Sequence, residues 1–167
     1  MRLFVAVWPD AGTLDVLSAL PRPVLPGVRW TRPEQWHVTL RFLGDTDAGE
    51  AAARVGAVSS GVPAVAAVMG PTCAFLGRNV LQVPVTGLDE LAGAVVDATA
   101  DLGRPPRPGP FHGHLTLARG RRPGDLRLLV GRAASSTWPV GEVSLVSSVP
   151  GRGGSRYDVV GRWALGP

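Results

Sequence analysis

The sequence predicts an α+β fold built on antiparallel sheets. Helical and extended stretches alternate along the 167 residues, and the extended stretches come in hairpin-like groups, which favours antiparallel pairing. A short pattern also occurs twice: His-Val-Thr-Leu at 37–40 and His-Leu-Thr-Leu at 114–117, each with an arginine close behind. The two histidines lie 77 residues apart, close to half of the chain. We therefore expect a duplicated arrangement of two lobes, each with an antiparallel sheet and outer helices, related by a pseudo-two-fold axis.

Apolar periodicity and turn residues predict the elements of the first half. Asp10 is the expected N-cap of the first helix, and Gly44 ends the first motif strand. The first half is thus expected to contain strands over residues 2–8, 28–31, 36–43 and 64–69, and helices over 10–20 and 45–60.

The second half is predicted in the same way. A turn at residues 77–79 joins two strands, and the Pro/Arg-rich stretch 103–110 is a linker into the second motif strand. The glycine-rich stretch 150–154 lacks the Gly-Lys-Ser/Thr ending of a P-loop, so we interpret it as a hairpin turn. The expected strands are 72–76, 80–85, 111–118, 138–148 and 156–165, and the expected helices are 87–102 and 124–132.

The repeated pattern is suited to acid–base chemistry. In a strand, residues two apart point to the same face, so each histidine shares a face with the threonine that follows it. Two imidazoles on opposite sides of a phosphate supply both the base that activates water and the acid that protonates the leaving oxygen. Threonine hydroxyls and arginine side chains can donate hydrogen bonds to its non-bridging oxygens.

A single His-x-Thr on a strand would carry no functional meaning, because threonine favours strands in any case. Two copies with the same apolar register, in contrast, favour a functional interpretation. The chain has only three histidines, and His37 and His114 begin the two copies.

At these residues the chain resembles the 2H phosphoesterase superfamily, named for two His-x-Thr-x motifs, and within it the LigT-like RNA 2′,3′-cyclic phosphodiesterases of the 2′-5′ RNA ligase family. The resemblance runs from residues 2–7 through Val28-Arg29-Trp30 and both motifs to residues 155–159. It implies one 2H phosphoesterase domain over residues 1–167, with the same bilobal fold and the histidines in the cleft between the lobes.

The resemblance also implies roles for particular residues. His37 would be the proton donor to the leaving hydroxyl, and His114 the proton acceptor that activates water. No metal or cofactor is expected. The expected substrate-binding residues are Thr39, Thr116, Arg41, Arg119 and Tyr157.

The expected reaction is metal-independent hydrolysis of RNA 2′,3′-cyclic phosphate ends to 2′-phosphate ends. Ligation of RNA halves through a 2′-5′ bond is an alternative, because the same residues serve the reverse reaction. A non-catalytic RNA-end binding module is an alternative of another class. It is favoured by the cluster Arg119, Arg121 and Arg122, which a solvated turn explains equally well, and by His112-Gly113, where the family usually has Arg-Pro.

Composition sets wider limits. Hydrophobic residues make up 45% and charged residues 18%, as in an ordinary globular protein, and one cysteine excludes an internal disulfide. All 17 basic residues are arginine, which suits phosphate binding but also reflects the codon usage of a GC-rich genome. No signal peptide or membrane span is evident. We expect a cytoplasmic monomer that acts on RNA ends or cyclic nucleotides. His112 and His114 share a strand face, but no third metal ligand is placed by the sequence.

Overall fold

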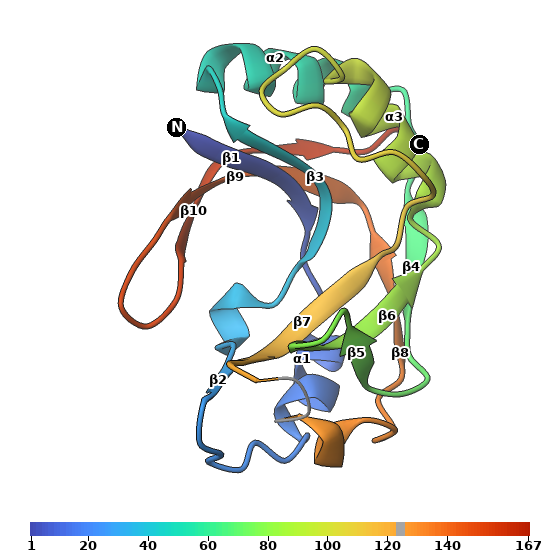
Figure 1. Cartoon of the computed structure of the whole chain (residues 1–167). Coiled ribbons are helices and arrows are strands. Elements are labelled where there is room, and N and C mark those ends of the chain that lie inside the picture. Colours follow the sequence, from blue (N-terminus) through green and yellow to red (C-terminus); the bar gives the residue numbers. More distant parts are fainter. Residues whose placement is uncertain (123–125) are drawn as a thin grey trace.

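Ten antiparallel strands form one curled sheet in the computed structural model, which describes residues 1–122 and 126–167 (Figure 1). The strands are β1 (Arg2–Val7), β2 (Val28–Trp30), β3 (Val38–Asp45), β4 (Val65–Met69), β5 (Ala74–Leu76), β6 (Val80–Thr86), β7 (His114–Gly120), β8 (Ser136–Val140), β9 (Glu142–Val149) and β10 (Arg156–Ala164). Their order is β10-β9-β1-β3-β7-β6-β4-β8, with β2 added to β7 and β5 to β6. The predicted α+β class with antiparallel pairing is confirmed.

The middle of the sheet is the contact between β3 and β7, where Val38 is in register with Leu115. Four strands, β10, β9, β1 and β3, lie on one side of this contact, and β7, β6, β4 and β8 lie on the other. The two sheets expected from the sequence are thus the two halves of one continuous sheet. The two motifs meet where these halves join.

The helices among the described residues are α1 (Ala11–Ser18), α2 (Ala48–Ser59) and α3 (Asp89–Ala98), with 3-10 turns η1 (Pro33–Gln35) and η2 (Arg127–Leu129). Asp10 caps α1 as predicted, since its carboxylate accepts a hydrogen bond from the Thr13 backbone nitrogen at 2.9 Å. Asp47 caps α2 in the same way at the Glu50 nitrogen. Capping by a side chain fixes where each of these two helices begins.

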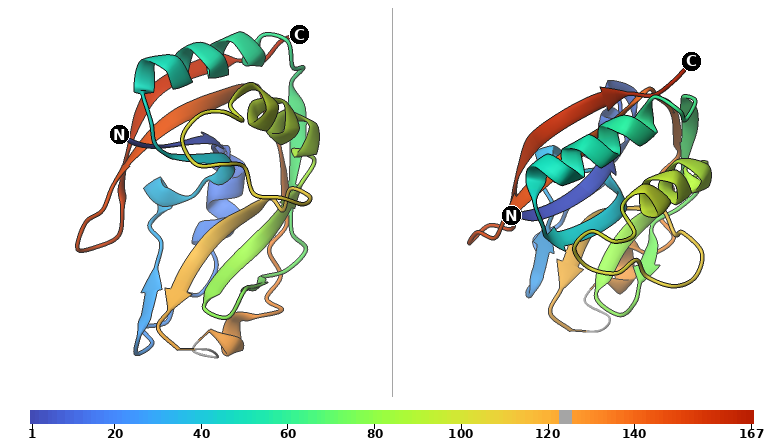
Figure 2. Two further views of the ribbon diagram at one scale, coloured as in Figure 1. Left: turned by 45° about the horizontal axis from the view of Figure 1, so that its top comes forward. Right: turned by 90° about the horizontal axis from the view of Figure 1, so that it is seen from above.

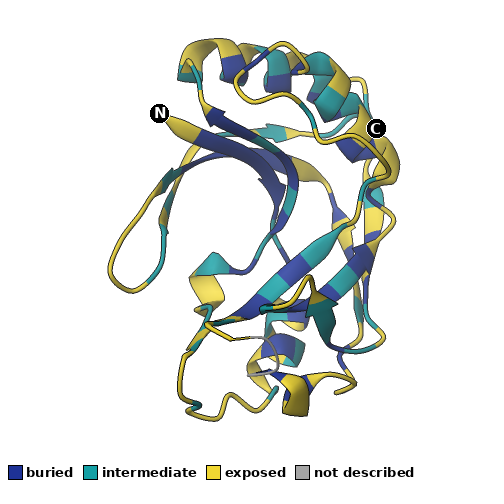
Figure 3. Ribbon diagram, viewed as in Figure 1, coloured by how far each residue is buried: buried dark blue, intermediate teal, exposed yellow. Residues whose placement is uncertain are grey.

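The main core fills the space between the helices and one face of the sheet. It brings Leu17 of α1, Val55 of α2 and Leu91 of α3 together with Val5 and Val38 of the sheet. Helices α2 and α3 lie side by side, with α2 packed on β9 and β10 and α3 on β3 (Figure 2), and β1 and β3 are mostly buried (Figure 3). Because the helices cover this face, the opposite, concave face of the sheet is left for the site.

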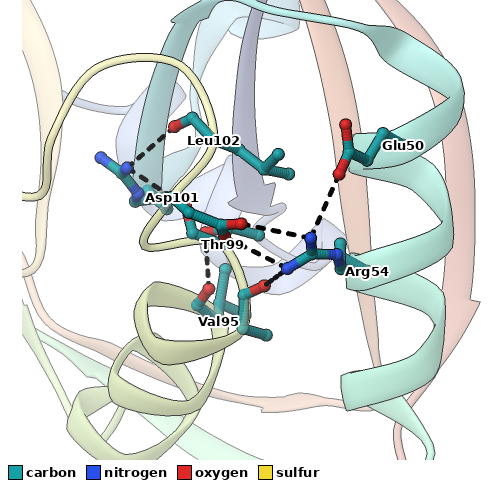
Figure 4. Close-up of polar contacts among 8 residues, drawn as sticks. Glu50, Arg54, Val95, Thr99, Asp101 and Leu102 are labelled. Carbon is teal, nitrogen blue, oxygen red and sulfur yellow. Dashed lines mark hydrogen bonds and ion pairs between the residues drawn. The ribbon is translucent and has the colours of Figure 1, made fainter.

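Two local contacts hold α2 in place. The Trp163 ring of β10 packs so closely on Gly56 that a Cβ there would lie 2.7 Å from the indole nitrogen, so only glycine fits. Arg54 pairs with Glu50 and Asp101 and donates to the Ala98 carbonyl, which ties α2 to the end of α3 (Figure 4).

Three predicted elements differ from the structure. The strand predicted over 138–148 is wrong: it is two strands, β8 and β9, which belong to different halves of the sheet and separate at Gly141. The helix predicted over 87–102 ends at Ala98, after which Thr99 donates to the Val95 carbonyl. Of the short helix predicted over 124–132, residues 124 and 125 lie outside the described part, and the remainder contains only η2.

Candidate active site

The antiparallel register of β3 and β7 sets the two motifs face to face. Because Val38 is paired with Leu115, His37 lies opposite Thr116 and Thr39 lies opposite His114. Val38 and Leu115 are fully buried in the main core, so the four polar side chains before and after them share the opposite, concave face. The structure therefore brings together both histidines and both threonines that the sequence singled out.

Both imidazoles are oriented by the same backbone contact. His37 Nδ1 lies 2.7 Å from the Gln35 carbonyl oxygen, and His114 Nδ1 lies 2.9 Å from the His112 carbonyl oxygen. A carbonyl only accepts, so each Nδ1 carries the proton and each Nε2 is the nitrogen that can take up or give up a proton in catalysis. The Nε2 of His37 lies 3.0 Å from Thr39 Oγ1 and accepts the hydroxyl proton in the neutral form.

Aromatic side chains surround His37 on the concave face. The ring centroids of Phe4, Trp8 and Tyr157 lie 4.9, 5.6 and 5.1 Å from that of the imidazole, and Tyr157 meets it edge-on. Burial lowers the pKa of His37 to about 4, an effect reinforced by the positive charges of His114 and Arg119 and opposed by the hydrogen bond to Gln35. His37 is therefore neutral at pH 7 in the ligand-free protein.

A β-bulge in each motif strand decides which arginine reaches the concave face. Residues 5 and 6 of β1 pair with 41 and 39 of β3, which leaves Leu40 unpaired. Residues 81 and 82 of β6 pair with 118 and 116 of β7, which leaves Leu117 unpaired. An extra residue reverses the alternation beyond it, so the fifth residue after each histidine, and not the fourth, shares the histidine's face. That residue is Phe42 in the first copy and Arg119 in the second.

Arg41 is a correction to the sequence prediction. As the fourth residue after His37 it points into the opposite face, where it is buried. Its guanidinium donates to the carbonyl oxygens of Phe42, Thr99, Leu102 and Arg104, of which Thr99 and Leu102 are drawn in Figure 4. Arg41 therefore joins β3 to the segment after α3, on the face of the sheet opposite to the two histidines.

A pocket of about 260 Å³ lies beside His114 on the second half of the sheet. Its lining includes Gln82, Pro84, Phe111 and His112. The amide oxygen of Gln82 is buried without a hydrogen-bond partner, which is costly unless a ligand supplies a donor. Sequence reasoning missed Gln82. Its signal was there, since Gln82 is the one polar residue in the otherwise apolar run of residues 80–85.

The departure at residues 112–113 has a structural cause. A Cβ at Gly113 would lie 2.3 Å from the Val85 carbonyl oxygen, because β7 approaches β6 closely here and the Val85 nitrogen donates to the Gly113 carbonyl. The glycine thus brings the segment before β7 against β6, next to His114. His112 itself is exposed, and the described residues contain no group of three or more potential metal ligands.

Two further sequence predictions concern membrane spans and the arginine that follows the second motif. None of the described helices has both the length and the apolar character that a membrane-spanning segment needs. Arg119 is exposed and acts electrostatically on His37, as expected for a residue on the concave face. Tyr157 lies at the same face, against His37 and Phe4.

A family model and several solved structures are similar to this chain. A family model described as LigT-like phosphoesterase matches residues 7–75. No curated protein matches the chain by sequence. Among solved structures, LigT of E. coli complexed with 3′-AMP is 25% identical with a TM-score of 0.76, covering 98% of this chain and 97% of that one. The protein TT0787 of Thermus thermophilus is 24% identical with a TM-score of 0.79, covering 99% and 98%, and shares the fold.

A further solved structure, described as a phosphoesterase, is 27% identical with a TM-score of 0.76 over 99% of this chain and 98% of that one. The family model over residues 7–75 and the whole-chain structural matches show that the chain is similar to the LigT-like phosphoesterases.

Proposed function

We propose that this phosphoesterase opens RNA 2′,3′-cyclic phosphate ends to 2′-phosphate ends by two-histidine acid–base catalysis without a metal. The observation that carries the proposal is the Val38–Leu115 register, which sets two His-x-Thr pairs opposite each other, with the Nδ1 of each histidine hydrogen-bonded to a backbone carbonyl. Because the site takes one motif from each half, we infer that the 167 residues act as one domain with two lobes.

In the proposed reaction, water attacks phosphorus while His114 Nε2 takes its proton. The bond from phosphorus to the 3′ oxygen breaks, and protonated His37 gives its Nε2 proton to that oxygen, which leaves as a hydroxyl. The hydroxyls of Thr39 and Thr116 and the guanidinium of Arg119 donate to the non-bridging oxygens, where charge accumulates in the transition state. Tyr157 keeps one side of His37 dry.

The donor role of His37 depends on the substrate. With a pKa of about 4, His37 is neutral before binding and has no proton on Nε2 to give. An anionic phosphate in contact with the imidazole favours its charged form, so we infer that substrate binding raises this pKa and loads the donor. The pocket beside His114 then accommodates the nucleoside, with Gln82 accepting a hydrogen bond from it.

Solved relatives support a nucleotide at this site. E. coli LigT has been crystallised with 3′-AMP, with NADP⁺, with ATP and with phosphate, and the 3′-AMP and NADP⁺ complexes are 25% and 26% identical to this chain. All of these ligands carry phosphate groups, which is the chemistry that the paired histidines, threonines and Arg119 would bind.

The test is hydrolysis of a 2′,3′-cyclic mononucleotide in EDTA, followed by phosphorus NMR. We expect a 2′-phosphate product, and a 3′-phosphate would refute the regiochemistry. His37→Ala and His114→Ala should each lower kcat/KM roughly 10²–10⁴-fold, while His112→Ala, which lines the pocket but matches no motif position, should lower it much less. Tight binding of RNA ends without any turnover would favour the non-catalytic alternative.

Two further assays distinguish hydrolysis from ligation and the proton donor from the proton acceptor. RNA halves ending in a cyclic phosphate and a 5′-hydroxyl test ligation, and accumulation of a 2′-5′ joined product over hydrolysis would favour the ligase alternative. A nitrophenyl ester, whose leaving group needs no proton, should restore activity to His37→Ala but not to His114→Ala. Recovery of His114→Ala alone would reverse the assigned roles.

A further inference from the structure

Two arginines lie directly opposite each other beside the proposed active site. Arg29 of β2 is in antiparallel register with Arg119 of β7, and both side chains are exposed. Like charges directly opposite on neighbouring strands destabilise a sheet. Within residues 1–122 and 126–167, no carboxylate lies within ion-pairing distance of either, whereas the neighbouring Arg32 pairs with Glu34 at 2.8 Å. The uncompensated pair is therefore suited to an anion from outside the protein.

The pair faces the same side as the two motifs. The bulge at Leu117 turns Arg119 onto the concave face, where its charge reaches His37. Residues paired across neighbouring strands point to the same side, so Arg29 shares that face. Because β6 pairs along the other edge of β7, β2 and β3 lie one after the other along the same edge, and Arg29 lies beyond the end of β3 that carries His37.

The β9–β10 hairpin limits where the Arg29 side chain can go. A Cβ at Gly154 would lie 3.4 Å from Arg29 Nη1, so the guanidinium packs against the backbone of this turn. Gln35 Nε2 donates to the Ser155 carbonyl at 2.8 Å and holds the turn beside η1. The turn and β2 lie on the same open side of the molecule (Figure 1), and the turn is exposed (Figure 3).

We propose that Arg29 binds the phosphodiester that precedes the cyclic phosphate, so that the protein prefers an RNA end to a cyclic mononucleotide. The proposal rests on the proposed function, because the reacting phosphate marks the end of the RNA chain from which the preceding phosphodiester is located. Thr116 and Arg119 contact the reacting phosphate. Successive positions on one face of a strand lie about 7 Å apart, so the pair stands one step along β7 from Thr116. Arg29, which stands opposite Arg119 and beyond the His37–Thr116 pair, meets the next phosphate of the same RNA chain.

A kinetic comparison tests this assignment. The ratio of kcat/KM for a dinucleotide with a 2′,3′-cyclic end to kcat/KM for the cyclic mononucleotide should exceed one in the wild type. Arg29→Gln should lower this ratio about 10-fold, the effect of losing a charge-assisted hydrogen bond. Arg127→Gln, an arginine on η2 outside β2, β3 and β7, is the matched control and should leave the ratio unchanged.

Two kinetic results for Arg29→Gln would overturn the proposal. If Arg29→Gln lowers both kcat/KM values equally, Arg29 belongs to the reacting phosphate and the second subsite does not exist. Unchanged kcat/KM values for both substrates would also overturn the proposal. Arg29→Gln should fold normally and unfold at the same temperature or slightly higher, because it removes a like-charge contact.

A binding measurement separates this proposal from the proposed function. The probes are the 2′-phosphate products, a dinucleotide and a mononucleotide, titrated calorimetrically at several salt concentrations. One extra phosphate contact should steepen the plot of log affinity against log salt by about 0.7 for the dinucleotide, and Arg29→Gln should abolish that difference. The same slope for both probes would refute the subsite. A slope difference in a protein that hydrolyses neither cyclic substrate would refute the proposed function alone.

Discussion

His37 should titrate near pH 4 in the folded, ligand-free protein, against an ordinary value of 6.5. The largest cause is burial in the aromatic wall of Phe4, Trp8 and Tyr157, which removes water from the charged imidazole. One pKa unit corresponds to about 1.4 kcal/mol, so the folded protein disfavours the charged form by about 3 kcal/mol.

The sign of the stability effect follows from the two pKa values. Between pH 6.5 and about pH 4, the unfolded chain binds a proton on His37 that the folded protein does not bind. The free energy of unfolding therefore falls as the pH is lowered through this window, and the loss from His37 approaches about 3 kcal/mol below about pH 4. Well above pH 6.5 the contribution of His37 no longer depends on pH.

Urea unfolding of the wild type and of His37→Gln at several pH values measures this loss. The stability of the wild type relative to His37→Gln should fall across the window, because the variant lacks the titrating group. His112→Gln is the matched control, since its side chain is exposed, and it should keep the wild-type pH dependence. Equal pH dependence in the wild type and His37→Gln would refute the argument from burial.

NMR titration gives the pKa directly, because the chain has only three histidines and their imidazole signals can be assigned by substitution. Saturation with a 2′-nucleotide should move the His37 midpoint upward, since the bound anion favours the charged form. A midpoint that stays near 4 in the complex would contradict the donor role of His37 and favour the reverse assignment.

Three further substitutions test the neighbouring structure. Arg41→Met should lower the free energy of unfolding by about 3 kcal/mol in urea denaturation, because buried carbonyl oxygens lose their donor, while KM stays close to wild type; a raised KM at unchanged stability would contradict this. Gln82→Met should raise the free energy of unfolding by about 1 kcal/mol and weaken nucleotide binding measured by calorimetry, and a loss of stability would show that the amide has a partner in the protein. Gly113→Ala should lower the melting temperature by forcing Cβ onto the Val85 carbonyl, and an unchanged melting temperature would mean that β7 shifts freely.

The arrangement of the two histidines and two threonines could be predicted because a strand alternates with a fixed period. The same rule placed Arg41 wrongly. It lies four residues after His37, and simple alternation puts it on the histidine's face. The bulge at Leu40 reverses that alternation, and no local sequence feature marks an unpaired residue inside an apolar run. Comparison of the two copies shows the difference, because Arg119 lies five residues after its histidine and Arg41 only four.

Other features depend on contacts between distant segments. Residues 138–148 have the composition of one strand, and only the pairing of β8 with β4 and of β9 with β1 shows that the chain changes halves at Gly141. The aromatic wall of His37 likewise combines β1, the residue after it and β10. Neither feature has a local signal, because each is decided by which strands become neighbours in the folded sheet.

The duplicated backbone gives the two histidines equivalent frames with unlike surroundings. Beside His37, the pairing strand β1 contributes Phe4 and Ala6, and the bulged motif strand contributes Phe42. The equivalent positions beside His114 are occupied by Val80, Gln82 and Arg119. One histidine therefore lies in an apolar aromatic wall and the other beside an amide and a guanidinium. The repeat supplies the symmetric geometry, and the side chains of the neighbouring strands make the surroundings of the two histidines unlike. The apolar wall keeps His37 neutral until an anionic phosphate binds, so in the proposed reaction the substrate itself completes the acid.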